Sequence, residues 1–221
     1  PKLDLILGYT YSVTDIEGSN SFGGTFDPIS SYEQDTDFFN IGLRGNISTK
    51  LTGFFKVGYR TRSPEDSIRF STPTDVTNPA NPIVGVTTPP TTINRKDSGM
   101  LGLDANLTWM ATTKLLVQLA LSRDFGAGGE GESTEATRAN LIGNYSFNTH
   151  WSTTASLGYS ETDYSDNGRE DEQFTGGLRV MYVLNTYWRF NAGYTYAENK
   201  SSLDGSGYKN ETLDLTAILR Y

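Results

Sequence analysis

Histidine and cysteine, which supply many catalytic bases, nucleophiles and metal ligands in proteins, are nearly absent from this chain. Among 221 residues there is one histidine, His150, and no cysteine, which excludes disulfides, thiolate metal sites and cysteine nucleophiles. Trp151 and Ser152 beside His150 give no spacing for a Ser-His-Asp set. The glycine-rich segment 126–131 contains no lysine and follows no phosphate-binding pattern. We therefore expect no catalytic residues, no metal site and no cofactor.

The overall composition excludes further classes of protein. Lys and Arg total 18 against 26 Asp and Glu, a formal charge of −8, whereas a nucleic-acid partner requires a basic face. With 36% apolar and 12% aromatic residues, we expect residues 1–221 to form a single ordered domain. No apolar run approaches the roughly 18 residues of a transmembrane helix, but a transmembrane strand needs only about 9 to 11.

Apolar residues recur at every second position in ten segments of the chain. In the first segment Leu3, Leu5 and Leu7 alternate with mostly polar even positions, which is the period of a strand with one apolar face. No segment has a sustained 3.6-residue period with helix caps. We therefore predict an all-β fold with ten strands, at 3–13, 39–47, 51–59, 101–109, 115–121, 137–147, 151–159, 174–184, 188–196 and 213–221.

The connections between these segments alternate strictly between short and long. The short ones are tight turns at 48–50, 111–114, 148–150 and 185–187, and the long polar ones cover about 14–36, 62–97, 125–135, 161–173 and 197–211. This alternation is typical of a transmembrane antiparallel up-and-down β-barrel with short periplasmic turns and long extracellular loops. A soluble up-and-down barrel would share the meander but would bury its apolar face inside.

Aromatic residues help to separate these two alternatives because they gather near both ends of the segments. Those beside short turns are Trp109, Phe147, Trp151, Tyr187 and Trp188, and those near long loops are Tyr9, Tyr11, Phe39, Tyr59, Tyr159, Phe174, Tyr194 and Tyr196. Amphipathic rings prefer membrane interfaces, so two such girdles indicate a bacterial outer-membrane barrel in contact with lipid and lipopolysaccharide. Tyr221 ends the chain on the apolar parity, in the form of the terminal aromatic signal that barrel-assembly machinery recognises.

The opposite parity would line a lumen, and its charges are mainly basic. The basic positions are Lys2, Arg44, Lys56, Arg60, Arg138, Arg179, Arg189 and Arg220, and the acidic ones are Asp4, Asp104, Asp124 and Asp214. Eight against four gives the wall a surplus of four positive charges, so the rest of a chain with net charge −8 carries about −12. Such a wall favours anionic solutes. Equally, arginine and aspartate side chains could pair across a narrow barrel and fill it.

Acidic clusters occupy the long connections. They comprise Asp15, Glu17, Asp27, Glu33 and Asp35; Glu130, Glu132 and Glu135; and Asp163, Asp166, Glu170, Asp171 and Glu172. The segment 166–168 lacks the ligand spacing of an EF-hand calcium loop. We interpret these clusters as solvated loops that face lipopolysaccharide, with loosely bound divalent ions as the alternative.

Four segments together resemble a β-barrel porin family of Gram-negative outer membranes that is associated with exopolysaccharide export. They read KLTGFFKVGYRTRSPEDS, DSGMLGLDANLTWMATTKLLVQLALSRD, HWSTTASLGYSETDYS and YWRFNAGYTYAENKSS. The resemblance implies an outer-membrane conduit for polysaccharide with no catalytic residues. Because that family's barrel is longer and this sequence begins at Pro1 without a targeting segment, we expect either removal of an upstream part or the C-terminal part of a larger barrel.

The leading hypothesis is therefore an outer-membrane pore or export conduit for polysaccharide or other anionic or sugar-like solutes. The alternative is a non-conducting structural barrel that acts as an anchor or binds partners through its long loops. Other envelope or export-complex proteins would be its partners in either case.

Overall fold

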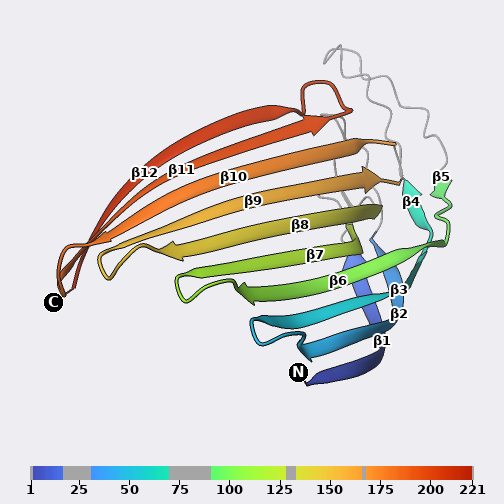
Figure 1. Cartoon of the computed structure of the whole chain (residues 1–221). Helices are drawn as coiled ribbons and strands as arrows, with labels where there is room; N and C mark the ends of the chain where they lie inside the picture. The colour runs from blue at the N-terminus through green and yellow to red at the C-terminus, as the bar shows by residue number, and fades with distance from the viewer. Residues whose placement is uncertain (1, 17–30, 70–90, 128–132, 166–167, 221) are drawn as a thin grey trace, which may run out of the picture.

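The computed structural model describes residues 2–16, 31–69, 91–127, 133–165 and 168–220 (Figure 1). Its strands are β1 (Leu3–Ile16), β2 (Tyr32–Asn46), β3 (Leu51–Pro64), β4 (Ser67–Arg69), β5 (Thr91–Ile93), β6 (Ser98–Met110), β7 (Leu115–Ala127), β8 (Ser133–Ser146), β9 (Trp151–Tyr164), β10 (Glu170–Val183), β11 (Trp188–Ser201) and β12 (Tyr208–Leu219). Ten of them form one antiparallel sheet, which confirms the predicted fold class. The described part of the chain contains no helix with the length and apolarity that a membrane crossing requires.

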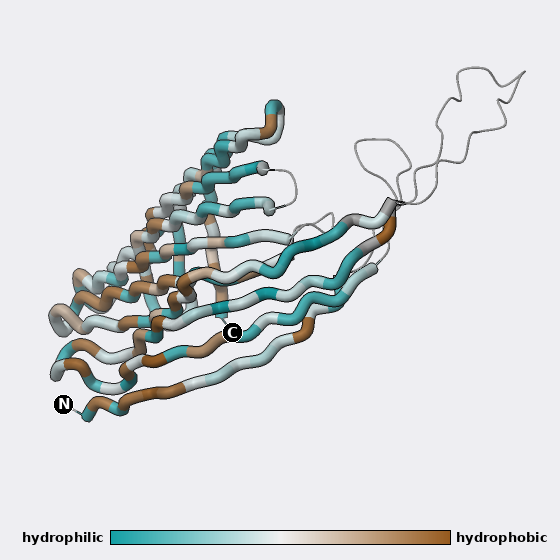
Figure 2. Tube along the Cα trace, turned by 90° about the vertical axis from the view of Figure 1, so that its right-hand side faces the viewer, coloured by the Kyte–Doolittle hydropathy of each residue, from teal (hydrophilic) through white to brown (hydrophobic). Residues whose placement is uncertain are grey.

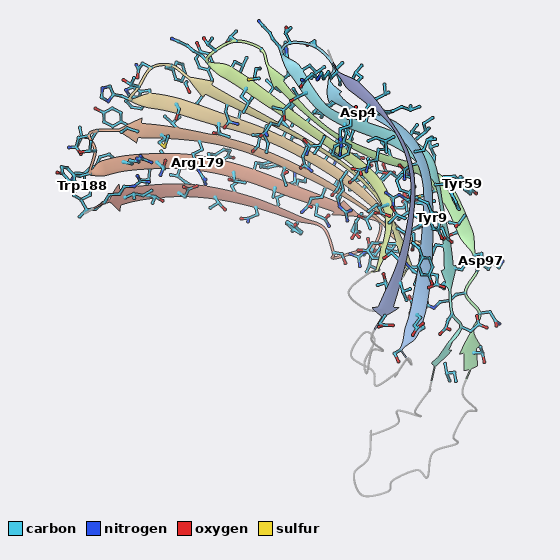
Figure 3. All side chains as sticks on the ribbon, turned by 90° about the horizontal axis from the view of Figure 1, so that it is seen from below. Asp4, Tyr9, Tyr59, Asp97, Arg179 and Trp188 are labelled. Carbon is cyan, nitrogen blue, oxygen red and sulfur yellow. The ribbon has the colours of Figure 1, made fainter. Side chains whose placement is uncertain are left out.

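The sheet is a meander that curves into a trough (Figures 1 and 3). Strands follow each other in chain order, except that β4 and β5 pair only with each other between β3 and β6. The connection 62–97, expected to be a loop, thus contains a short hairpin. Among the described residues β1 and β12 form the two edges and are not paired with each other. Lipid cannot satisfy unpaired backbone groups, so in a membrane both edges need partners, either each other or further strands.

The strands continue further into the long connections than the apolar pattern predicts. For example, β9 extends to Tyr164 and pairs with β10 as far as Asp163 opposite Glu170. Most of the strands in the sheet have 13 to 15 residues, more than the roughly 9 to 11 needed to cross a bilayer. Backbone pairing persists where the surroundings no longer impose apolar alternation, and Figure 2 shows hydropathy falling from the turn ends toward the loop ends.

A polar side chain at the start of each short turn caps the turn's backbone. Asn148 Oδ1 accepts hydrogen bonds from the backbone N–H groups of His150 and Trp151 at 2.8 and 2.9 Å. The same arrangement recurs at the other three predicted turns, with Ser48, Thr112 and Asn185 as acceptors. Short side chains that bond the backbone two or three residues further on are frequent at turns for this reason.

In three of the short turns, the residue two positions after the capping residue also contacts the following hairpin. Lys50 Nζ donates to the carbonyl of Ala111 at 3.1 Å, and Lys114 Nζ donates to that of Phe147 at 2.9 Å. His150 Nδ1 lies 2.8 Å from the carbonyl oxygen of Val183. These contacts link successive hairpins along the turn edge of the sheet.

Buried side chains lie at the opposite, loop end of the sheet. Tyr32, Gln34, Phe38, Arg62, Met100, Ser133, Thr134 and Ala136 are all less than 7% exposed. In contrast, many large apolar residues at odd positions of β1, β2, β3, β6, β8 and β9 are exposed, as with Leu7 at 76%. The apolar face therefore lies on the outside of the curve, which is the reverse of a soluble barrel.

Candidate functional site

The two faces of the curved sheet carry different chemistry because paired residues share a face. On the convex face Leu141 lies opposite Leu157, and on the concave face Lys56 lies opposite Asp104. The parity of the sequence pattern is retained across all nine strand pairs of the sheet. A polar concave face and an apolar convex face are the arrangement that a barrel wall in lipid requires.

The predicted girdle aromatics that belong to strands lie on the convex face, where Tyr196 is only partly exposed, whereas Phe147 and Tyr187 lie in the short turns. Beside the turns, Trp109, Phe147, Trp151, Tyr187 and Trp188 are exposed, and so are Tyr9, Tyr11, Phe39, Tyr59, Tyr159, Phe174 and Tyr194 toward the loop end. Figure 3 shows Tyr9 and Tyr59 on the outer side of the curve and Trp188 at the turn edge. The Tyr9 hydroxyl donates to Asp37 Oδ1 at 2.6 Å. Their role at the membrane interfaces stays a prediction, and Tyr221 lies outside the described residues.

Three of the four predicted acidic wall residues pair with bases on the concave face. Lys56 Nζ lies 3.7 Å from Asp104 Oδ2. Arg60 Nη1 lies 3.0 Å from Asp124 Oδ1, and Arg179 Nη2 lies 3.4 Å from Asp214 Oδ1. The pairs run along the sheet, between adjacent strands or strands two apart, so they do not bridge the trough.

Glycines on the intervening strands make room for the two longer pairs. A Cβ on Gly102 would approach Arg60 Cγ and Phe38 Cε2 to 2.7 Å each, and a Cβ on Gly193 would overlap the Asp214 carboxylate. Gly193 lies directly opposite both Arg179 and Asp214 in the strand register. Inward glycine thus leaves room for each arginine to reach its carboxylate along the wall.

The remaining basic wall residues have no such neutralisation. Within the described ranges, the structure gives no ion pair to the other five, which are Lys2, Arg44, Arg138, Arg189 and Arg220. Asp4 is the register partner of Arg44 but forms no ion pair with it. Arg138 is exposed on β8, while Arg44, Arg189 and Arg220 lie near the turn edge. Most of the positive surplus of the concave face therefore lies toward its turn end.

At the loop end of the concave face, residues that the sequence pattern did not single out join β2 and β3 to β8 and the end of β9. Arg62 Nη2 donates to Ser165 Oγ at 3.2 Å and Nη1 donates to the carbonyl of Thr134 at 3.5 Å. Ser133 Oγ donates to Gln34 Oε1 at 3.3 Å. The predicted long connections 14–36 and 62–97 include Gln34 and Arg62, although both residues continue the even parity of their strands, and this continuation is the signal available in the sequence.

A small cavity lies beside this closure on the concave side. Its volume is about 270 Å³, and hydroxyl, amide and charged groups contribute to its lining along with two phenylalanines. Arg60 and Asp124 form part of its wall together with Phe38, whose ring centroid lies 3.7 Å from the Arg60 guanidinium carbon. The cavity offers hydrogen-bonding groups but no nucleophile with an activating base.

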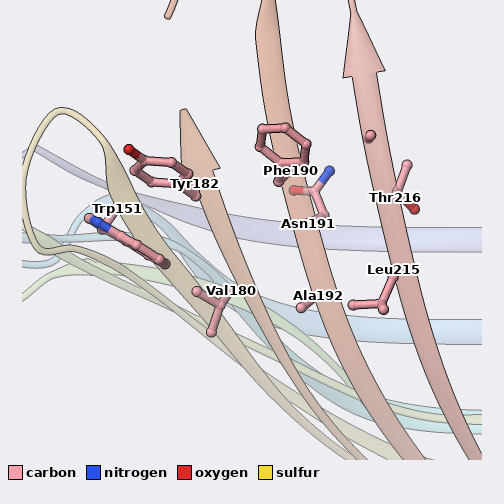
Figure 4. Close-up of a pocket in the computed structure, with 9 residues that line it drawn as sticks. Trp151, Val180, Tyr182, Phe190, Asn191, Ala192, Leu215 and Thr216 are labelled. Atoms are coloured by element: carbon pink, nitrogen blue, oxygen red, sulfur yellow. The ribbon is translucent and has the colours of Figure 1, made fainter. Parts of the chain in front are cut away.

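A second hollow lies on the convex face near the turns of β9 to β12 (Figure 4). It has a volume of about 470 Å³, and Trp151, Tyr182, Phe190 and Leu215 surround the small residues Ala192 and Ala217. Most of its lining is apolar and belongs to the outward parity. It is thus a groove in the apolar surface and stands apart from the charged wall.

The acidic clusters do not assemble a metal site in the part of the chain that the structure describes. Asp171 is held by Arg169, with Nε to Oδ1 at 2.9 Å, and Glu135 Oε2 lies 3.8 Å from Arg123 Nη2. The expected cluster members Glu17, Asp27, Glu130, Glu132 and Asp166 lie outside the described residues. His150 is used at the turn edge, far along β9 from these loop-end carboxylates.

An antiparallel meander with an apolar convex face, aromatic residues at both ends and a charged concave face defines a β-barrel membrane protein. Residues 95–221, more than half of the chain, match the family model described as "Putative beta-barrel porin 2". The chain belongs to this family and is an outer-membrane β-barrel porin. Porins are channels rather than enzymes, so the expectation of a non-enzymatic protein of the bacterial outer membrane is confirmed.

Two solved structures are similar to the chain at low identity. One is OmpT, an outer membrane protein of Vibrio cholerae, with 10% identity, a TM-score of 0.46, and coverage of 100% of this chain and 84% of OmpT. The other is a mutant of the TodX monoaromatic hydrocarbon channel, with 14% identity, a TM-score of 0.38, and coverage of 99% and 71%. A comparison with curated protein sequences gave no match. Family membership alone carries the identification.

Proposed function

We propose that the concave face of this porin is the wall of a path for anionic solutes, acidic polysaccharide among them. The observation that carries the proposal is the unequal pairing of charges on that wall. Asp104, Asp124 and Asp214 each have a basic partner, whereas Arg138 and Arg189 have no acidic partner among the described residues. The net field of the wall is therefore positive.

A positive wall acts on solutes through the low-dielectric environment that surrounds it. Field lines from fixed charges are focused into a water-filled cleft, which raises the local concentration of counter-ions. Charged rings in pores select solutes of opposite sign in the same way. The course of Arg179 along the sheet to Asp214 favours passage, because a side chain paired across the trough would stand in the path.

Polysaccharide as cargo is supported by the resemblance of the sequence to an export-associated porin family and by the chemistry of the concave cavity. Hydroxyl and amide groups, an aromatic ring and a charged pair line this cavity. Such groups hydrogen-bond to sugar hydroxyls and carboxylates and offer an apolar ring to a sugar face.

A non-conducting barrel is the second candidate, and one observation favours it. Gln34, Arg62, Ser133 and Thr134 are each at most 5% exposed, so solvent is excluded from the part of the loop end where β2 and β3 meet β8. A barrel that stayed sealed would serve as an anchor for envelope partners.

Liposome swelling tests the proposal with solutes of matched size. Vesicles that contain the full-length protein are diluted into an acidic oligosaccharide or into a neutral one of equal length. We expect faster swelling with the acidic solute, and a loss of that preference in the Arg138→Gln, Arg189→Gln double variant. Equal rates for both solutes contradict the anionic preference, and no swelling with either solute supports the anchor.

A further inference from the structure

We propose that Arg62 and Gln34 on one side, and Ser133, Thr134 and Ser165 on the other, form an openable constriction at the extracellular end of the pore. We call this set the loop-end bridge. It deepens the proposed function, because it names the residues that would control access to the path. Its evidence is independent of the charge surplus on which that function rests.

The loop-end bridge connects strands that are distant in the sheet. Gln34 lies on β2 and Arg62 on β3, whereas Ser133 and Thr134 lie on β8 and Ser165 follows β9. β6 and β7 separate the two groups. Neighbouring strands lie about 4.8 Å apart, so direct side-chain contact over three or more strand spacings requires the sheet to fold sharply over itself at this end.

Burial distinguishes this end from the rest of the concave face. Arg62 is 3% exposed and Gln34 and Ser133 are 2% exposed, while the Arg179 side chain, nearer the turns, is 60% exposed. The residues of the loop-end bridge are thus much less accessible to solvent than Arg179, although Thr14 on β1 and Tyr208 on β12 are exposed at the same end. The aromatic ring of Phe125 closes the space further, with its centroid 4.6 Å from the Arg62 guanidinium carbon.

The chemistry of the loop-end bridge suits a contact that opens. A buried arginine is costly to desolvate, and well-packed apolar residues would seal a permanently closed end at least as well. The bridging hydrogen bonds are long, at 3.2 to 3.5 Å. Their polar groups can exchange partners for water when the two sides separate, at little net cost.

The absence of cysteine from the sequence provides a direct test. A single Asn140→Cys substitution places a thiol on the concave face of β8, on the turn side of the loop-end bridge. Cells that display the full-length protein are treated with a membrane-impermeant maleimide from outside, and the labelling rate is measured. This rate reports access past the loop-end bridge and requires no ionic current.

Ser133→Ala and Ser165→Ala each remove a hydroxyl from the loop-end bridge with little change in volume. We expect each substitution to raise the labelling rate of the Asn140→Cys protein, and the Ser133→Ala, Ser165→Ala double variant to raise it by about tenfold. A change of this size corresponds to the loss of one or two hydrogen bonds that stabilise the closed state of a two-state contact. Arg62→Lys, which keeps the charge but loses the forked geometry, should give an intermediate rise. Ser160→Ala, on the same face of β9, is the matched control and should leave the rate unchanged.

The proposal would be overturned if the Asn140→Cys protein with an unchanged loop-end bridge were labelled as fast as the two serine variants. If Ser133→Ala fails to fold, as judged by heat-modifiable electrophoretic mobility, the Ser165→Ala and Arg62→Lys rates decide. A protein that shows faster labelling in the variants but no solute flux in liposomes would retain the loop-end bridge and reject the proposed function. Solute flux in liposomes together with identical labelling rates in all variants would retain the proposed function and reject the loop-end bridge.

Discussion

Arg60 reaches Asp124 across an intervening strand, with Nη1 3.0 Å from Oδ1, because Gly102 leaves its own side-chain position empty. The Phe38 ring covers the other side of the guanidinium. This relationship determines how the wall is built. The two charges neutralise each other along the concave face, over the intervening strand β6, and not across the trough.

Gly102→Ala should destabilise the protein, because the added Cβ would approach Arg60 Cγ and Phe38 Cε2 to 2.7 Å. Overpacking of this kind costs about 1–3 kcal/mol. The measurement is the free energy of unfolding by urea in detergent. Gly143→Ala is the control, since a Cβ there meets no atom within 4 Å. Equal stability of the two variants would show that the Arg60 side chain does not need the gap.

Leu141→Arg and Ile142→Arg test the assignment of the two faces with adjacent residues of similar size. Leu141 and Ile142 are similarly exposed, at 39% and 37%, but point to opposite faces of β8. Arginine on a lipid face near mid-membrane costs about 2–4 kcal/mol, so we expect Leu141→Arg to reduce the folded, membrane-inserted fraction much more. The fraction is measured by heat-modifiable mobility after refolding into vesicles. A larger loss for Ile142→Arg would reverse the assignment.

The turn cap at Asn148 should contribute measurably to stability. Asn148→Ala removes the acceptor of two backbone N–H groups, and we expect a loss of about 1 kcal/mol in the free energy of unfolding, as for other exposed side-chain caps. Thr149→Ala is the matched control, because the Thr149 side chain makes no hydrogen bond within the described residues. A cost shared equally by both variants would mean that the capping contacts contribute nothing specific.

The acidic wall residues should moderate the charge preference of the pore. Asp124→Asn leaves Arg60 without its counter-charge and so increases the positive field of the wall. We expect a shift of the zero-current potential toward stronger anion selectivity in a salt gradient. Glu135→Gln, which alters a carboxylate of the outward parity paired with Arg123, should leave that potential unchanged. A shift toward cations on Asp124→Asn would contradict a role for this pair in the path.

The period-two pattern sufficed to predict the ten strands, the four short turns and the two faces, because lipid enforces alternation at every spanning residue. It failed where water replaces lipid. Gln34, Arg62 and Thr134 lie on strand ends that project beyond the apolar stretch, and their mutual contact depends on how sharply the sheet folds over itself. Period two carries no information about that curvature, so the loop-end bridge and the β4–β5 hairpin could not be predicted.

The pairing of wall charges was likewise only partly accessible from the sequence. Lys56 and Asp104 are opposite each other once the strand register is known. Arg60 and Asp124 are not direct partners, and their contact depends on the empty position at Gly102. Sequence alone therefore left open whether the basic and acidic residues of the wall pair across the lumen or along the wall.

The zero-current potential of the full-length porin in a planar bilayer, under a gradient of potassium chloride, tests the central claim most directly. We predict stepwise channels with a potential that indicates chloride preference, and a reduced preference in the Arg138→Gln, Arg189→Gln double variant. Arg123→Gln, which alters an arginine of the convex face, should leave the potential unchanged. Channels selective for potassium, or a preference indifferent to Arg138 and Arg189, would contradict the account.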